Sequence, residues 1–128
     1  MNGGTIDGVT IGGASAGAIT GTTLTATGKT IFDGTTTSSG AGAVGITGSI
    51  HEITTTGTGD ALTLANGTEG QRLFIVYATE TVGADTAVLT PTNMGNGSTI
   101  TFSIVGQNAM GIFTNGKWYF SAQGAVIS

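Results

Sequence analysis

The chain has no cysteine, one proline, and few charged or aromatic side chains, which make up 8% and 6% of its 128 residues. Without cysteine it forms no disulfide and has no thiol nucleophile, so cysteine usage does not indicate a redox compartment. No run approaches the 18 apolar residues of a membrane-spanning helix. The N-terminal residues Met1–Thr5 lack the basic and apolar regions of a secretory signal. We therefore expect no membrane partner.

Basic residues are also scarce. Lys29, Arg72 and Lys117 are the only three, and the formal net charge is −4. Binding nucleic acid requires a basic face that neutralises several phosphates, and three dispersed cations cannot build one. An anionic membrane surface is excluded on the same ground. The charge pattern therefore predicts no nucleic-acid partner.

Glycine and threonine fill the chain instead, with 24 and 26 copies. Glycine loses the most backbone entropy on folding, and threonine favours strands. Disorder is the first alternative, but positive mean hydropathy and a small net charge argue against it. A monomer of 12.5 kDa with this composition is expected to bury little apolar area against that entropy cost. The composition therefore predicts an all-β protein that assembles with copies of itself as a homotrimer.

The composition changes near Gly57. Residues 1–57 are expected to form an extended Gly/Thr-rich arm, used for attachment or intertwining. Within it, Thr5–Thr10 resembles Ile31–Thr36, and Gly17–Thr22 resembles Val44–Ser49, at offsets of 26 and 27 residues. Such a period is typical of stacked supersecondary units, although a Gly/Thr bias also produces matches by chance. Both interpretations stay open.

Residues 58–128 predict a compact antiparallel β domain, a small sandwich or barrel. No segment keeps the apolar period of a long helix. Asn115-Gly116 predicts a two-residue hairpin, and Asn66-Gly67 and Asn96-Gly97 predict turns of the same kind. Pro91 is expected at a strand end. The predicted strands are Ala61–Ala65, Arg72–Thr79, Ala87–Thr90, Ser98–Val105, Ala109–Thr114, Lys117–Ala122 and Ala125–Ile127.

The apolar pattern also predicts the core. Leu73–Tyr77 is a continuous apolar run, typical of a strand covered on both faces. Strict alternation places Ile100, Phe102 and Ile104 on one buried face. Trp118 and Phe120 likewise share a face that we expect to be in the core.

Two glycine-containing motifs resemble nucleotide-binding loops. Gly40–Gly45 matches G-x-G-x-x-G, and Thr23–Thr30 ends like a P-loop but begins with threonine in place of glycine. Both mechanisms need a helix N-terminus that receives the phosphates. No helix is expected after either motif, so the sequence predicts no cofactor.

His51 is the single histidine, and Glu52 follows it. In a strand these neighbours point to opposite faces and form no dyad within one chain. We expect His51 to face solvent or an interface. The alternative is a ring of three His51 side chains on a threefold axis that holds a metal or an anion.

The remaining polar residues do not form a catalytic set. The seven acids are scattered without calcium-loop spacing, and no Ser/His/acid trio is discernible. Asn66-Gly67-Thr68 and Asn96-Gly97-Ser98 are glycosylation sequons, but the expected turns explain both. The sequence therefore predicts no catalytic, cofactor-binding or metal residue, and the protein is not expected to be an enzyme.

Two parts of the chain resemble appendage proteins of tailed bacteriophages, especially marine and cyanobacterial phages. At the N-terminal end the likeness lies in Gly4–Gly13 and Gly21–Thr27. In the C-terminal half it lies in Ala61–Gln71, Leu89–Asn93 and Gly116–Tyr119. This resemblance implies a homotrimeric structural protein on the virion surface, assembled in the host bacterial cytoplasm, and it implies no active site.

Two placements on the virion compete. A capsid decoration (cement) or head-fibre protein would bind the major capsid protein or another virion protein and stabilise the shell. A tail fibre or fibre tip would contact host surface glycans. The short chain favours decoration, whereas the fibre-like N-terminal strings favour a fibre. In a third alternative, an autonomous sugar-binding module, Trp118, Tyr119 and Tyr77 would stack on sugar rings.

Overall fold

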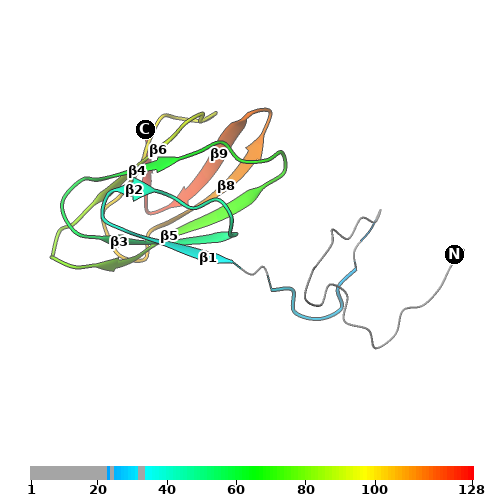
Figure 1. The fold of residues 1–128 in the computed structure, drawn as a ribbon, viewed down its shortest axis with the longest axis horizontal. Coiled ribbons are helices and arrows are strands. Elements are labelled where there is room, and N and C mark those ends of the chain that lie inside the picture. Colours follow the sequence, from blue (N-terminus) through cyan, green and yellow to red (C-terminus); the bar gives the residue numbers. More distant parts are fainter. Residues whose placement is uncertain (1–22, 24, 32–33) are drawn as a thin grey trace, which may run out of the picture. The chain divides into compact units, whose positions relative to one another are not determined.

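The computed structural model describes residues 23, 25–31 and 34–128, and these residues contain strands but no helix. The chain divides into two units, Met1–Thr30 and Ile31–Ser128. All described strands belong to the second unit (Figure 1). Their bounds are β1 Thr35–Ser39, β2 Gly42–Ala43, β3 Ile50–Thr55, β4 Asp60–Leu64, β5 Arg72–Glu80, β6 Ala87–Pro91, β7 Ile100–Phe102, β8 Asn108–Thr114, β9 Lys117–Gln123 and β10 Val126–Ile127.

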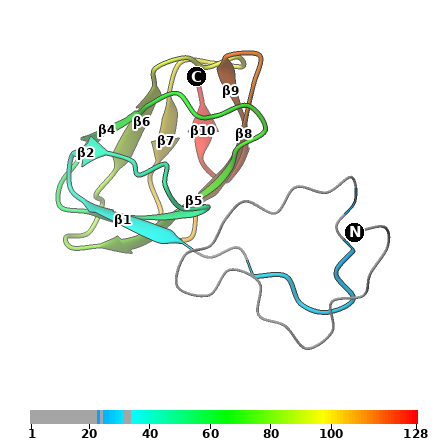
Figure 2. The ribbon, with the colours of Figure 1, turned by 45° about the vertical axis from the view of Figure 1, so that its right-hand side comes forward.

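The strands form two five-stranded sheets that pack face to face as a sandwich (Figure 2). The first sheet has the order β1-β3-β5-β8-β9, and the second has the order β10-β7-β6-β4-β2. From β1 to β6 the chain enters the other sheet at every step. Each strand therefore pairs in parallel with the next but one along the chain, as in β1 with β3 and β2 with β4.

The N-terminal six strands are thus a parallel coil of three rungs, β1/β2, β3/β4 and β5/β6. The last four strands pair in antiparallel fashion and complete both sheets. The all-β class and the sandwich are confirmed. The prediction of a purely antiparallel domain is wrong, because crossing between sheets makes parallel neighbours. The barrel alternative is also wrong, since the two sheets stay separate.

The sandwich includes part of the predicted arm. The compact unit begins at Ile31, whereas the sequence places the start of the domain at residue 58. Residues 35–55 supply β1, β2 and β3, and Ile53 of β3 is fully buried in the core. The first copies of the two repeats, Thr5–Thr10 and Gly17–Thr22, lie outside the described residues.

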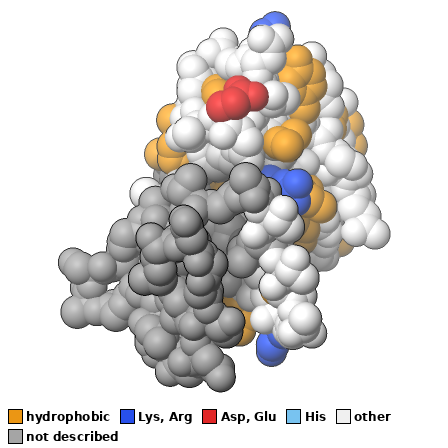
Figure 3. Space-filling view, turned by 90° about the vertical axis from the view of Figure 1, so that its right-hand side faces the viewer, with side chains coloured by type: hydrophobic (Ala, Val, Ile, Leu, Met, Phe, Trp, Pro, Cys, Tyr) orange, Lys and Arg blue, Asp and Glu red, His pale blue; other side chains and the backbone are white. Residues whose placement is uncertain are grey.

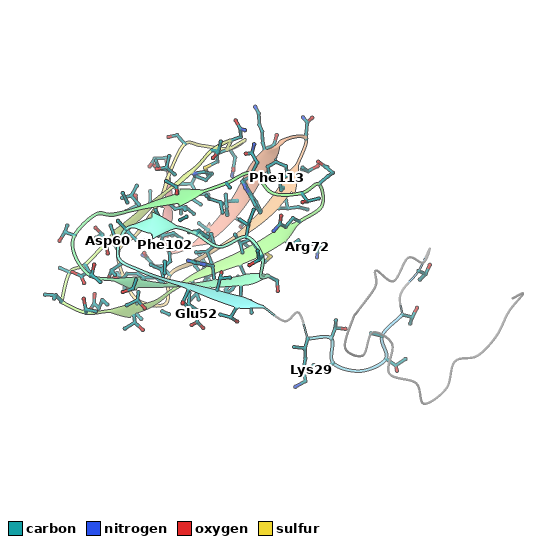
Figure 4. All side chains as sticks on the ribbon, in the orientation of Figure 1. Lys29, Glu52, Asp60, Arg72, Phe102 and Phe113 are labelled. Atoms are coloured by element: carbon teal, nitrogen blue, oxygen red, sulfur yellow. The ribbon has the colours of Figure 1, made fainter. Side chains whose placement is uncertain are left out.

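Inward-facing side chains from both sheets form one core (Figure 4). Leu73, Ile75 and Tyr77 of β5 are fully buried, whereas Phe74 and Val76 on the opposite face are half-buried. The prediction that this strand is covered on both faces therefore holds for one face only. Trp118 and Phe120 are both buried, as predicted.

Turn chemistry explains one hairpin and fails for two others. Asn115 and Gly116 adopt φ values of 52° and 70° and join β8 to β9, as a type I′ turn requires. Pro91 ends β6, as predicted. Asn66-Gly67 instead lies in the connection that crosses between the sheets, and Asn96-Gly97 lies in the long connection from β6 to β7. Neither of these is a two-residue hairpin.

Strand β7 is shorter than the alternation predicts. It ends at Phe102, and Ile104 is 66% exposed in the following turn. The Gln107 side-chain carbonyl accepts bonds from the N–H groups of Ser103 and Ile104, at 2.6 and 3.3 Å. This cap turns the chain before the third apolar residue can reach the core. The inclusion of Ile104 in the buried face is therefore wrong.

The difference between Phe102 and Ile104 is measurable. Phe102→Ala is expected to lower the free energy of unfolding by about 3–5 kcal/mol, because it opens a cavity at a fully buried site. Ile104→Ala removes an exposed side chain and should change it by less than about 0.5 kcal/mol. Denaturant titration of both variants measures this. Equal losses would show that the exposed turn packs more tightly than described.

Candidate functional site

The outer face of the first sheet carries an exposed apolar strip. Alternation along β8 and β9 turns Ala109 and Trp118 inward and leaves Met110, Ile112 and Tyr119 outside. Their side chains are 55%, 39% and 37% exposed. Large exposed apolar groups that gather on one face are typical of contact surfaces. We call these three residues the apolar strip.

The strip borders an open depression of about 420 Å³. The pairing of β5, β8 and β9 places Arg72, Ile112 and Tyr119 in one row across the sheet, and Met110 lies opposite Ser121. Figure 3 shows hydrophobic side chains next to a basic one on the face that it presents, and Figure 4 labels Arg72, the first residue of β5. The depression is lined by Arg72, Met110, Gly111, Ile112, Tyr119, Phe120 and Ser121.

Two glycines shape this surface. A Cβ atom at Gly95 would overlap the ring of Tyr119, so the bare backbone of the β6–β7 connection lets the ring lie against it. A Cβ at Gly111 would come within 2.5 Å of the Phe120 ring, which fills the core beneath the strip. The exposed Tyr119 ring is therefore supported from one side by Gly95.

Only one of the three predicted sugar-stacking aromatics is accessible. Trp118 and Tyr77 are fully buried. The Trp118 indole donates to the carbonyl of Ala65 at 2.9 Å, and the Tyr77 hydroxyl bonds to Thr55 at 2.7 Å. The stacking role is therefore wrong for these two residues, because their polar atoms serve the fold. Tyr119 alone lies at a depression.

His51 lies inside the sandwich, not on its surface. It is fully buried on β3 and points toward β1. Its Nδ1 lies 2.7 Å from the Thr36 hydroxyl, and its Nε2 lies 3.1 Å from the Ser38 hydroxyl. Both ring nitrogens have partners within the chain. The expected solvent or interface location is therefore wrong, and in this arrangement His51 is not available for a ring on a threefold axis.

The burial of His51 makes the stability of the fold depend on pH. Desolvation lowers the pKa of His51 below 6.5, and the charge of Glu52 opposes the shift in the upward direction. Below pH 6.5 the unfolded chain therefore binds a proton that the folded chain resists. Stability is retained above that pH and is lost as the pH falls through the lowered pKa of the folded state.

We expect the guanidinium concentration at the unfolding midpoint to decrease when the pH is lowered from 7.5 to 5.5. His51→Gln removes the titrating ring and keeps an amide for the two hydroxyls, so its midpoint should change much less over the same range. Guanidinium titrations at four pH values test this. An identical slope in both proteins would assign the pH dependence to other groups.

A second polar cluster lies at the end of the core. The Thr55 hydroxyl is 3.3 Å from a carboxylate oxygen of Asp85, and the Tyr77 hydroxyl donates to the Asp85 carbonyl at 3.2 Å. That same carboxylate oxygen accepts from the Val82 N–H at 3.1 Å. These bonds fix the β5–β6 turn. In the part of the chain that the structure describes, no three metal-ligating residues gather in one place.

The two segments that resemble nucleotide-binding loops are Gly40–Gly45 and Thr23–Thr30. The glycines of the first segment shape the β1–β2 connection. Gly40 and Gly42 sit at the β1–β2 connection with φ values of 70° and 156°, and a side chain at Gly45 would approach Thr36 to 2.8 Å. Residues 23 and 25–30 are irregular. Neither described segment precedes a helix.

The asparagines of both sequons form side-chain bonds. Asn66 accepts from the side-chain amide of Asn93 at 3.1 Å. Asn96 pairs with the backbone of Phe120. Bonds between segments, rather than the expected hairpin turns, therefore account for these asparagines.

We compared the chain with known proteins in three ways. Searches with protein-family models, among curated proteins and among solved structures find no match. Within the described residues, no helix is long and apolar enough to span a bilayer. The candidate site is therefore defined by its own geometry, the apolar strip and its depression.

Proposed function

We propose that this protein is a non-enzymatic structural protein of a bacteriophage virion surface. It forms a homotrimer that decorates the capsid as a cement or head-fibre protein, and it binds and stabilises the shell. The observation that carries the proposal is the apolar strip of Met110, Ile112 and Tyr119 on the outer face of the first sheet. Such a face suits contact with another protein surface.

Two further features support this proposal. The sequence resembles phage appendage proteins near its N-terminus and within its C-terminal half. The interior of the sandwich is also fully hydrogen-bonded, because no buried side-chain nitrogen or oxygen among the described residues lacks a partner. A structural protein that acts through shape needs such a scaffold.

The second candidate is a tail fibre or fibre tip that contacts host glycans. Tyr119 favours it, because its ring is partly exposed beside Arg72 and Ser121 in the same depression. An aromatic ring next to polar donors is a common sugar-binding arrangement. Copy number separates the candidates, since decoration gives copies that scale with shell area and a tail part gives a few per particle.

The trimer is the first testable consequence. Multi-angle light scattering at micromolar concentration should give three times the 12.5 kDa of one chain. Ile112→Lys should shift the mass toward the monomer without a loss of folding, because it places a charge in the apolar strip. Ile104→Lys is the matched control at an exposed apolar residue outside the strip and should remain trimeric. A wild-type protein that stays monomeric and folded would contradict the proposal.

A further inference from the structure

Glycine follows four asparagines of the chain, which are Asn2, Asn66, Asn96 and Asn115. An asparagine in this setting loses its side-chain amide without an enzyme when the backbone nitrogen of the next residue attacks the amide carbon. Glycine favours this attack because it has no Cβ and leaves its backbone free to rotate. Asn2 lies outside the described residues. The structure holds the amide groups of the other three asparagines in three different ways.

The side chain of Asn96 is held at both atoms of its amide group. Its Nδ2 donates to the Phe120 carbonyl at 2.7 Å, and its Oδ1 accepts from the Phe120 N–H at 3.0 Å. Attack on the amide carbon makes that carbon tetrahedral and expels the nitrogen, so both bonds to β9 would be lost. The folded structure therefore protects Asn96.

The backbone protects Asn115, although its side chain is exposed. Its φ of 52° begins the type I′ turn, in which the ψ of this residue is about 30°. That ψ places the Gly116 nitrogen nearly opposite the Asn115 side chain, whereas attack needs both on the same side of the Cα–C bond. The Glu69 carboxylate also accepts from the Asn115 N–H at 3.0 Å and from the Thr114 hydroxyl. The hairpin must therefore open before Asn115 reacts.

Asn66 has neither protection. It is exposed in the irregular connection between β4 and β5, and its φ is not in the left-handed region. Among the described residues, its side chain makes one hydrogen bond, in which Oδ1 accepts from the side-chain amide of Asn93 at 3.1 Å. Attack on the amide carbon places negative charge on this same oxygen, and a donor aimed at it stabilises that charge. The nitrogen that has to leave is not the atom that is held.

We propose that Asn66 is a site of spontaneous deamidation, and that the fold spares Asn96 and Asn115. The Gly67 nitrogen gives its proton to hydroxide and forms a bond to Cγ of Asn66. The bond from Cγ to the side-chain nitrogen breaks, and that nitrogen takes a proton from water and leaves as ammonia. Water then opens the five-membered succinimide ring at either carbonyl, which yields aspartate or isoaspartate. No oxidant or reductant takes part.

The isoaspartate product should disturb the packing around Trp118. The Ala65 carbonyl accepts from the Trp118 indole at 2.9 Å, and a Cβ atom at Gly67 would come within 2.8 Å of the same ring. Isoaspartate inserts a methylene group into the backbone between these two contacts, so this form should melt at a lower temperature. Asn66→Asp keeps the normal backbone and an oxygen that accepts from Asn93, so it should melt like the parent protein.

Peptide mapping by mass spectrometry measures the reaction at each site. The full-length protein is incubated at pH 8.5 and 37 °C and then digested with trypsin. Tryptic peptide 30–72 contains Asn66, and peptide 73–117 contains Asn96 and Asn115, which fragment spectra distinguish. We expect the deamidated fraction at Asn66 to be at least fivefold larger than at either of the other two sites.

The same protein unfolded in guanidinium is the control. All three asparagines precede glycine, so without the fold they should react at rates within twofold of one another. In the folded protein, equal fractions at the three sites, or a faster reaction at Asn96 or Asn115, would overturn the proposal. A site at Asn66 that reacts only in guanidinium would also overturn it.

Asn93→Ala tests the role of the donor. It removes the amide that bonds to Oδ1 of Asn66, so deamidation at Asn66 should slow at least threefold. Thr92→Ala changes the exposed neighbouring residue and should leave the rate unchanged. If exposure alone made Asn66 reactive, Asn93→Ala would leave the rate the same or raise it, and either result would contradict activation by Asn93.

Discussion

Deletion of residues 1–57 is expected to abolish cooperative folding of the remaining chain. The deletion removes β1, β2 and β3, and β5 loses the neighbour with which it pairs from Phe74 to Glu80. It also removes Ile53 from the core and the Thr55 hydroxyl that bonds to Tyr77. The inward face of β5 would then be exposed to water.

Deletion of residues 1–30 is the matched control. It keeps every described strand, so the chain from Ile31 should melt in one cooperative transition. Circular dichroism during thermal unfolding compares the two truncations. Composition alone predicts the opposite for the longer deletion, because it makes residues 1–57 an extended attachment or intertwining arm and residues 58–128 a compact domain that folds without it. A cooperative transition in the chain from residue 58 would contradict the sandwich described above.

Trp118→Ala is expected to be the most destabilising single substitution, with a loss of about 5 kcal/mol or more. The side chain is fully buried, and its removal leaves the largest cavity in the core. Its ring meets Phe113 edge-on at 5.3 Å and stacks on Phe120 at 5.8 Å. Each aromatic pair adds about 0.5–1.5 kcal/mol beyond its buried area. The Ala65 carbonyl also loses its donor.

Trp118→Phe separates these contributions. It keeps an aromatic ring between Phe113 and Phe120 but removes the N–H that binds Ala65, so the loss should be about 1–3 kcal/mol. Denaturant titration followed by circular dichroism measures both variants, since neither keeps the single tryptophan as a fluorophore. Losses below about 1 kcal/mol in both would place Trp118 outside the core.

The C-terminal strands follow from the sequence because their signals are local. Arg72–Thr79 and Lys117–Ala122 are each one residue shorter than the strands observed. Alternation places Trp118 inside and Tyr119 outside without reference to any distant residue. Asn115-Gly116 defines its hairpin by the backbone conformations that these two residues tolerate.

The parallel coil does not follow from such signals. Strand β1 is Thr-Thr-Thr-Ser-Ser, in which no hydrophobic alternation marks a buried face. Strand β1 pairs with β3 only because the chain crosses to the second sheet at β2 and then returns. No turn motif in the sequence predicts this crossing. The surroundings of His51 escape prediction for the same reason, because Thr36 and Ser38 lie on that unrecognised strand.

The candidate site is partly accessible to sequence reasoning. Sequence analysis names Tyr119 only as one of three aromatics in the sugar-binding alternative, whereas the depression joins it to Arg72 from a strand far away in the chain. The row through Arg72, Ile112 and Tyr119 exists only once β5, β8 and β9 are paired in register. Long-range register therefore decides which exposed residues form a surface.

Cryo-electron microscopy of virions of the phage that we propose as the source of this protein tests the central claim most directly. We expect threefold-symmetric densities on the outside of the shell, in numbers that scale with its area, and three copies of the sandwich should fit each density. The apolar strip should be buried in these densities. Particles without such density, in which the protein is absent or occurs only at the tail, would contradict a capsid decoration role.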